Sequence, residues 1–136
     1  MKKLFLLSFL FVTIITLGQN IVHIQYRYVA SENVAEFEAL ETEHWSKIKK
    51  NAIENGNMLV SAFFRVHGRT DDETKPTHAF VQVFKSFEQY EGQMKIWNNT
   101  EQILGFNPAF ASTNDISKTL YNDTYKLVAE LPMGEF

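Results

Sequence analysis

The sequence contains no cysteine, and this absence removes several kinds of chemistry at once. It excludes disulfide bonds, thiolate metal ligands, a cysteine nucleophile and a lipid-modified N-terminal cysteine. A chain without covalent crosslinks has to hold its fold by packing a hydrophobic core. The sequence therefore predicts a protein whose stability rests on apolar burial.

Positive charge is also scarce and scattered. The chain has 13 Lys and Arg against 16 Asp and Glu, and the basic residues form no cluster in the mature part. A nucleic-acid partner is therefore not expected, because phosphate backbones are bound by clustered basic side chains. The sequence also lacks a GxSxG elbow, a phosphate-binding glycine loop and an HExxH motif, which excludes the enzyme classes that depend on them.

The first residues have the pattern of a secretory signal peptide. Lys2 and Lys3 precede a largely apolar run at 4–17, and small residues at Thr16 and Gly18 suit a cut before Gln19. The run is shorter than the roughly 20 residues that span a bilayer. We predict a signal peptide over residues 1–18, export to the periplasm or the outside of a bacterial cell, and no stable membrane insertion after cleavage.

Removal of this segment leaves residues 19–136, which are enough for one domain and too few for two. Two lysines leave with the signal peptide, so the mature chain has 11 basic and 16 acidic residues and a net charge of −5. We predict a single domain over residues 19–136.

The spacing of apolar residues predicts alternating strands and helices. Residues 21–29 alternate with the period of a strand, whereas 34–54 carry an apolar stripe at helical spacing. The full prediction is strands at 21–29, 58–67, 77–84 and 124–130, with helices at 34–54, from Ser86, and at 114–120. Apart from the short third helix, this order is βαββαβ. It predicts an α+β, ferredoxin-like fold, with a four-stranded antiparallel sheet and helices on one face.

The hairpin at 58–84 has two different faces. Pairing His67 with His78 makes one face wholly apolar, and we expect the helices to cover it. The other face mixes polar residues with Phe63, Phe80 and Phe84, and in water it would be a large apolar patch. We therefore predict a homodimer in which two such faces close a barrel. The polar residues expected at this dimer face are His23, Arg27, Arg65, His67, His78 and Gln82.

The element order, the sequence Glu41, His44 and Trp45 within the long helix, and the 80–84 strand before Ser86 resemble the dimeric α+β barrel superfamily. The closest likeness is to antibiotic-biosynthesis-monooxygenase-like domains and their secreted bacterial relatives. The resemblance implies a pocket between helices and sheet. The superfamily includes cofactor-free oxygenases, haem-processing enzymes and isomerases, so the resemblance indicates the fold more than the function.

His44 is the candidate catalytic residue. In the implied pocket it could act as a general base, a haem ligand or a hydrogen-bonding partner of the ligand. The alternative is a histidine at the core edge, bonded to Glu41 or a backbone carbonyl. The residues expected to line the ligand site are Tyr26, Tyr28, Trp45, Tyr90, Met94 and Trp97, and the alternative for these is ordinary core packing.

Three histidines, His23, His67 and His78, could converge to bind zinc, copper or iron. Two of them lie at the neck of the hairpin, where polar residues are ordinary, so we predict no metal site and no cofactor, with haem as the alternative.

The leading hypothesis is an exported homodimer that binds a small apolar or aromatic ligand between helices and sheet. The alternatives are a cofactor-free monooxygenase-like or haem-processing enzyme, and a non-catalytic interaction module.

Overall fold

The computed structural model describes residues 20–68, 71–98 and 113–127. The predicted signal peptide at 1–18 lies outside this part of the chain. Most of the segment 98–114, for which the sequence predicts irregular structure, also lies outside it, as does the end of the strand predicted at 124–130.

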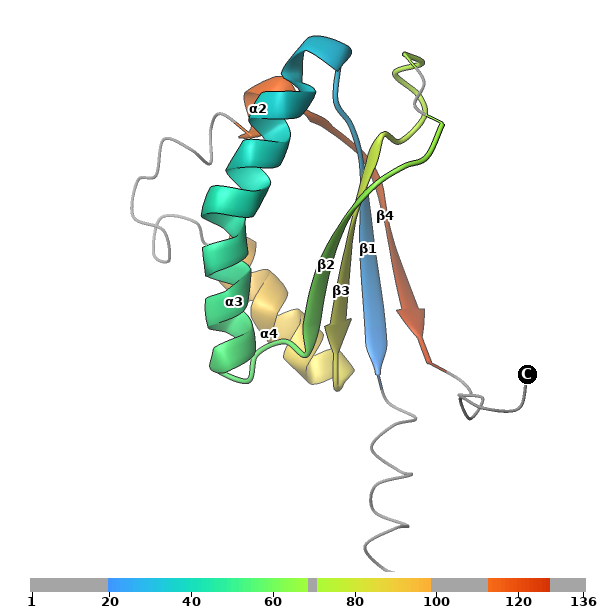
Figure 1. Cartoon of the computed structure of the whole chain (residues 1–136). Coiled ribbons are helices and arrows are strands. Elements are labelled where there is room, and N and C mark those ends of the chain that lie inside the picture. Colours follow the sequence, from blue (N-terminus) through green and yellow to red (C-terminus); the bar gives the residue numbers. More distant parts are fainter. Residues whose placement is uncertain (1–19, 69–70, 99–112, 128–136) are drawn as a thin grey trace, which may run out of the picture.

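The described residues form a single four-stranded antiparallel sheet (Figure 1). Its strands are β1 (Ile21–Tyr28), β2 (Val60–Arg65), β3 (His78–Phe84) and β4 (Lys118–Lys126), in the order β2-β3-β1-β4. This is the ferredoxin-like arrangement, and it confirms the predicted fold class. The prediction for the last strand was wrong at its start, because pairing with β1 overrides the low strand propensity of Lys118, Asn122 and Asp123.

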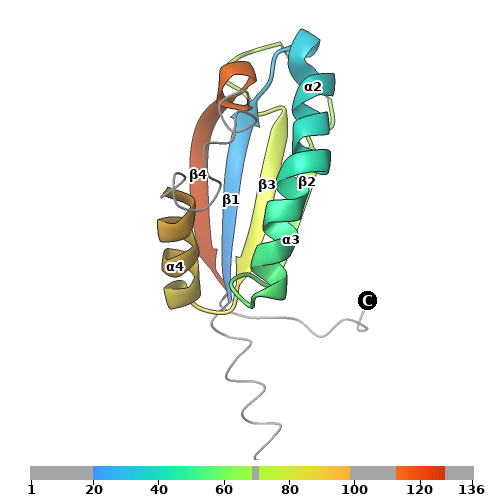
Figure 2. The same ribbon diagram turned by 90° about the vertical axis from the view of Figure 1, so that its left-hand side faces the viewer.

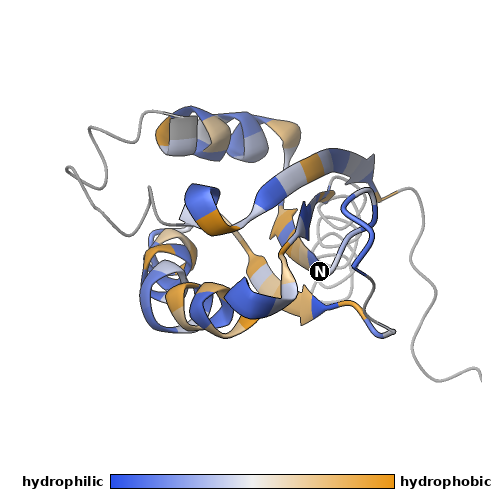
Figure 3. Cartoon of the chain, turned by 90° about the horizontal axis from the view of Figure 1, so that it is seen from above, coloured by the Kyte–Doolittle hydropathy of each residue, from blue (hydrophilic) through white to orange (hydrophobic). Residues whose placement is uncertain are grey.

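One long helical segment follows β1. It consists of the 3-10 turn η1 (Ser31–Asn33), α2 (Val34–Ala39), the π-helical segment η2 (Leu40–Trp45) and α3 (Ser46–Glu54). Helix α4 (Phe87–Asn98) follows β3, and Ser86 caps it by accepting a hydrogen bond from Gln89 N. Both helical segments lie on the same face of the sheet (Figures 2 and 3). None of the helices in the described part has the length and apolar character needed to cross a bilayer.

The core between helices and sheet has two clusters. One joins Val29, Phe37 and Phe80, and Phe63 packs against it. The other consists of Ile21, Ala52, Met58 and Phe84, with Tyr90, Met94 and Trp97 packed on it. Phe37 from α2 and Phe84 from β3 are both fully buried, one in each cluster. Apolar contacts therefore hold the helices against the sheet in two places.

The prediction of which sheet face the helices cover was wrong. Arg65 pairs with His78 and Phe63 with Phe80, a shift of two residues from the expected register. A shift of two leaves every side chain on its expected face. The helices, however, cover the mixed face, since His78, Phe80, Gln82 and Phe84 are all buried, and the wholly apolar face is the uncovered one.

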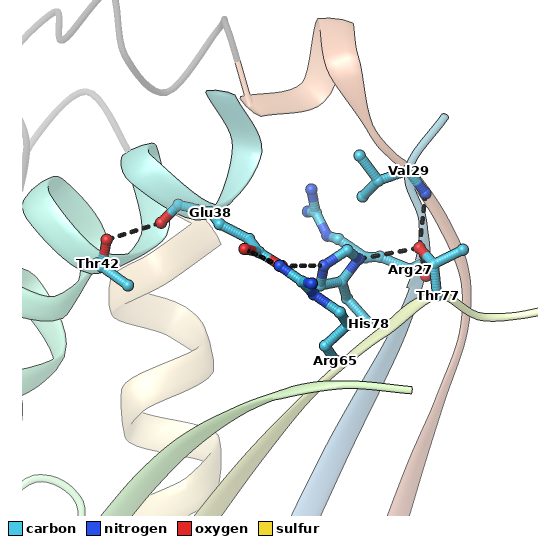
Figure 4. Close-up of polar contacts among 7 residues, drawn as sticks. All are labelled: Arg27, Val29, Glu38, Thr42, Arg65, Thr77 and His78. Atoms are coloured by element: carbon cyan, nitrogen blue, oxygen red, sulfur yellow. Dashed lines mark hydrogen bonds and ion pairs between the residues drawn. The ribbon is translucent and has the colours of Figure 1, made fainter. Parts of the chain in front are cut away.

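The mixed face is covered because its polar groups find partners on the long helical segment (Figure 4). Arg65 Nε donates to Glu38 Oε1 at 2.6 Å, and Arg65 Nη2 bonds the other oxygen. His78, fully buried between the rings of Phe37 and Phe63, reaches Glu38 Oε1 at 3.0 Å through Nε2. Its Nδ1 lies 2.9 Å from the Thr77 hydroxyl. These bonds remove the cost of burying polar groups.

The uncovered face is apolar on β1, β2 and β3, whereas β4 adds Asp123 opposite Ile24 and Lys118 opposite Tyr28. Tyr26 pairs with Ala79 and Tyr121, and the other positions of β1, β2 and β3 on this face are Val22, Ile24, Tyr28, Val60, Ala62, Phe64, Val81 and Val83. Several of its side chains remain about half exposed, among them Val60 (49%), Phe64 (52%), Tyr121 (46%) and Tyr125 (50%). An apolar area of this extent, over β1, β2 and β3, is typical of interaction surfaces.

The Glu38–Arg65 pair makes an acid-dependent contribution to stability. The Arg65 guanidinium holds the pKa of Glu38 below its ordinary value of 4.5, with a smaller contribution from His78. A lowered pKa in the folded state gives stability that is complete above the ordinary pKa and is lost as pH falls through the lowered one. We expect Arg65→Met to destabilise the protein at pH 7, and the difference from wild type to shrink toward about pH 3.

Chemical denaturation across this pH range measures the effect. The control is Lys50→Met, which removes the exposed Lys50–Glu54 pair at 3.8 Å; exposed pairs contribute little, so this difference should stay near zero at every pH. A pH-independent loss in Arg65→Met would contradict the prediction.

Candidate functional site

A cavity of about 220 Å³ lies between the sheet and the helices. Its floor is the covered face of β1 and β3, its walls come from the long helical segment and α4, and one side is closed by the residues just before β4. The lining residues are His23, Gln25, Arg27, Glu41, Trp45, Ile48, Lys49, Phe80, Gln82, Met94, Trp97, Thr113 and Asn114.

The π-helical segment η2 sets the helix wall of this cavity. In an uninterrupted α-helix, eight residues make two turns and overshoot by about 80°. The wider π turn at Leu40–Trp45 removes most of this overshoot. Lys49 therefore comes back to the side of Glu41, and Trp45 lies between them. π segments recur at functional sites, and here the segment brings two charges and an indole ring to one wall.

Glu41 and Lys49 form a buried ion pair in that wall. Lys49 Nζ lies 3.1 Å from Glu41 Oε2, with side-chain exposures of only 15% and 5%. The ammonium also lies 4.2 Å from the centre of the Phe80 ring, a cation–π contact. Burial raises the pKa of Glu41 despite the nearby cations, and burial lowers the pKa of Lys49 despite the carboxylate. Each group depends on the other to keep its charge.

Arg27 is the third charged residue of the cavity. Its Nε donates to Gln25 Oε1 at 3.0 Å, Nη1 to Ser117 Oγ at 2.6 Å and Nη2 to Asn114 Oδ1 at 3.5 Å. Burial lowers its pKa, and the more distant Glu41 opposes that effect. The guanidinium is thus oriented by three neutral oxygens.

The rest of the wall is apolar and aromatic. Trp45 from η2 and Trp97 from α4 line the cavity together with Met94 and Phe80. The Trp45 indole donates from Nε1 to Thr113 Oγ1 at 2.9 Å, which holds the ring in place. An apolar wall with a few placed polar groups is the usual composition of a small-molecule site.

The structure brings together some of the predicted site residues and separates others. Trp45, Met94 and Trp97 line the cavity as expected, whereas Tyr90 packs beside it against Phe84 and His23. The placement of Tyr26 and Tyr28 in the ligand site was wrong. The covered face carries His23, Gln25 and Arg27, so the alternating tyrosines point to the uncovered face, where Tyr26 contacts Tyr121.

The prediction of a polar dimer face was also wrong. His23, Arg27 and Gln82 line the cavity, and Arg65 and His78 bond to Glu38 of α2. All five lie on the face beneath the helices because the helices cover the mixed side of the sheet. His67 is exposed beyond the end of β2.

The candidate base His44 is not among the residues that line the cavity. It is half-buried, and its ring lies edge-on to Trp45 at 5.8 Å between centroids. Glu41, one turn earlier, takes the inward position. No group of three or more potential metal ligands gathers within the described residues, and of the three candidate histidines only His23 reaches the cavity.

Sequence reasoning missed the charged centre of the site. Glu41 was placed in the long helix beside His44 and Trp45 and considered as a partner for His44, and Lys49 was given no role in the site. The available signal was the inward stripe through Phe37 and Glu41. Nothing in the sequence pattern separates Lys49 from Lys47 or Lys50, because the π segment that turns it inward has no signature of its own.

Comparison with known proteins shows which solved structures share this fold. No protein-family description matches the chain, and no curated protein sequence matches it. Solved structures do. Two dimeric ferredoxin-like proteins from an uncultured marine organism are similar, one with TM-score 0.66, 16% identity and coverage of 88% of this chain and 96% of the other, the second with TM-score 0.61, 14% identity and coverage of 82% and 97%.

A mutant of the cofactor-independent oxygenase SnoaB from Streptomyces nogalater is similar at TM-score 0.55 and 11% identity, over 84% of this chain and 98% of the other. At these identities the likeness concerns the fold. The chain has the ferredoxin-like α+β fold that these dimeric proteins and this oxygenase share, in agreement with the predicted resemblance.

Proposed function

We propose that this protein is exported, forms a homodimer through its uncovered sheet face, and binds a small aromatic ligand in the cavity between helices and sheet. The observation that carries the proposal is the cavity itself, with Trp45, Trp97, Met94 and Phe80 around its apolar part. Its volume of about 220 Å³ exceeds the roughly 150 Å³ of an apolar cavity known to hold benzene. A ligand of one aromatic ring with a short substituent therefore fits.

Native mass spectrometry of the protein purified from its own host tests the three parts together. We expect the mass of a dimer, in which each subunit has the mass of a chain that begins at Gln19. We also expect an additional small mass, that of a bound ligand, which is lost on denaturation. A full-length subunit would contradict export. If the protein carries no ligand and no added one-ring aromatic compound binds at millimolar concentration, the ligand proposal is wrong.

The dimer proposal rests on the uncovered face. Val81 is central on this face, between Ile24 of β1 and Ala62 of β2, and the similar marine proteins are described as dimeric. On β1, β2 and β3 this face carries only apolar and tyrosine side chains, and a second copy offers a matching surface.

We expect Val81→Lys to convert the dimer into a monomer, because two ammonium groups would be buried across the interface. Size-exclusion chromatography with light scattering measures the change. The control is Phe87→Lys, at a side chain on α4 that is 55% exposed; this variant should remain dimeric. A wild-type monomer at high concentration would overturn the proposal.

A further inference from the structure

The charges around the cavity do not balance. Among the described lining residues, Arg27 and Lys49 are cationic and Glu41 is anionic. His23 adds no charge at neutral pH, since burial lowers its pKa below the ordinary value. The described part of the cavity wall therefore carries one surplus positive charge.

Internal rearrangement does not remove this surplus. Glu41 neutralises Lys49 at 3.1 Å. If the carboxylate turned to Arg27, Lys49 would lose its counter-ion, so one cation is left over in either arrangement. A partner chain on the uncovered face would be separated from Arg27 by the sheet. Arg27 is partly buried, a partly buried charge without a counter-ion is costly, and a bound anion would reduce that cost.

The guanidinium of Arg27 is oriented so that it can bind such an anion. Gln25, Ser117 and Asn114 accept one hydrogen bond each, and a guanidinium has five N–H donors. The three bonds fix the plane of the group, while its charge and further donors remain available. Planar guanidinium groups match carboxylates with two parallel hydrogen bonds.

We propose that the ligand of this cavity is a small aromatic monocarboxylic acid, whose carboxylate pairs with Arg27 while its ring lies among Trp45, Trp97, Met94 and Phe80. This rests on the proposed ligand-binding function and specifies its chemical class. A single surplus charge favours a monoanion over a phosphate ester, which would bring a second negative charge beside Glu41.

Three one-ring probes of similar size test this class: benzoate, benzamide and benzylamine. We expect isothermal titration of the full mature protein to give benzoate an affinity about tenfold above benzamide, with benzylamine the weakest. In Arg27→Gln the preference for benzoate should fall to near one, while the affinity for benzamide is retained. Trp45→Ala should weaken benzoate and benzamide alike.

The outcomes separate this inference from the function on which it rests. Equal binding of benzoate and benzamide to the wild-type protein overturns the acid class and leaves the aromatic site standing. A benzoate preference that persists in Arg27→Gln overturns the role of Arg27. If none of the three probes binds, both proposals fail. Should Arg27→Gln not fold, the wild-type series decides the ligand class, and retention of the preference in Arg27→Lys decides the role of the charge.

Discussion

Replacing Glu41 with leucine is expected to lower the free energy of unfolding by about 3 kcal/mol. The change leaves Lys49 buried in the helix wall without its carboxylate, while its ammonium stays in contact with the Phe80 ring. The loss has an upper limit, because a lysine of ordinary pKa 10.5 can shed its proton at pH 7 for about 5 kcal/mol. Denaturant unfolding at one protein concentration measures the change.

The pH dependence identifies the cause. Burial lowers the pKa of Lys49 in the folded state, so its charged form costs stability below that pKa, and the cost disappears as pH rises toward the ordinary value. The deficit of Glu41→Leu should therefore shrink between about pH 7 and pH 10. The double variant Glu41→Leu with Lys49→Met should recover most of the loss, because buried ion pairs can be replaced by apolar residues at little cost.

The matched control is Glu43→Leu, which removes an exposed carboxylate two residues along the same helix. Its effect should be within about 0.5 kcal/mol. If Glu41→Leu costs no more than this control, Glu41 and Lys49 do not form a buried ion pair, and the surplus charge assigned to Arg27 is wrong.

The sequence was sufficient for the fold because local patterns and element order agree with each other. Period-two alternation in residues 21–29, the helical stripe from Val34 and the Ser86 cap each specify one element. The order of these elements leaves few topologies for a chain of this size. No distant contact had to be known to predict the sheet.

The orientation of the sheet could not be obtained in the same way. Alternation shows which residues share a face, and it grouped His78, Phe80, Gln82 and Phe84 correctly. It does not show what covers that face. The answer depends on Glu38, whose bonds to Arg65 and His78 satisfy the mixed face, and a helical glutamate looks the same in sequence whether it faces water or a partner.

Some site residues could likewise be predicted from local sequence patterns, whereas others depended on the three-dimensional arrangement. Trp45, Met94 and Trp97 lie at apolar positions of helices, so their place in the cavity could be predicted from the sequence. The tyrosines of β1 were placed on the wrong side as a direct consequence of the reversed sheet. Lys49 required knowledge of the π segment, whose effect on helical phase appears only in three dimensions.

Replacing Phe37 with alanine is expected to cost about 3–5 kcal/mol in the free energy of unfolding. Phe37 is fully buried, and its ring lies 5.1 Å from the His78 ring, 6.0 Å from Phe63 and 6.2 Å from Phe80 between centroids. The change opens a cavity next to the bonds that tie Glu38 to the sheet. It therefore weakens both the apolar cluster and the attachment of α2, and a large fall in the melting temperature should accompany it.

The comparison that isolates burial is Phe87→Ala, which removes the same side chain from α4 where it is 55% exposed and touches Tyr90. This control should cost less than about 1 kcal/mol. Both variants should be measured at the same protein concentration, since subunit association adds to apparent stability. Similar losses for the two phenylalanines would mean that Phe37 is not packed between α2 and the covered sheet face. The position of the helices over that face, and with it the cavity beside Glu41, would then be wrong.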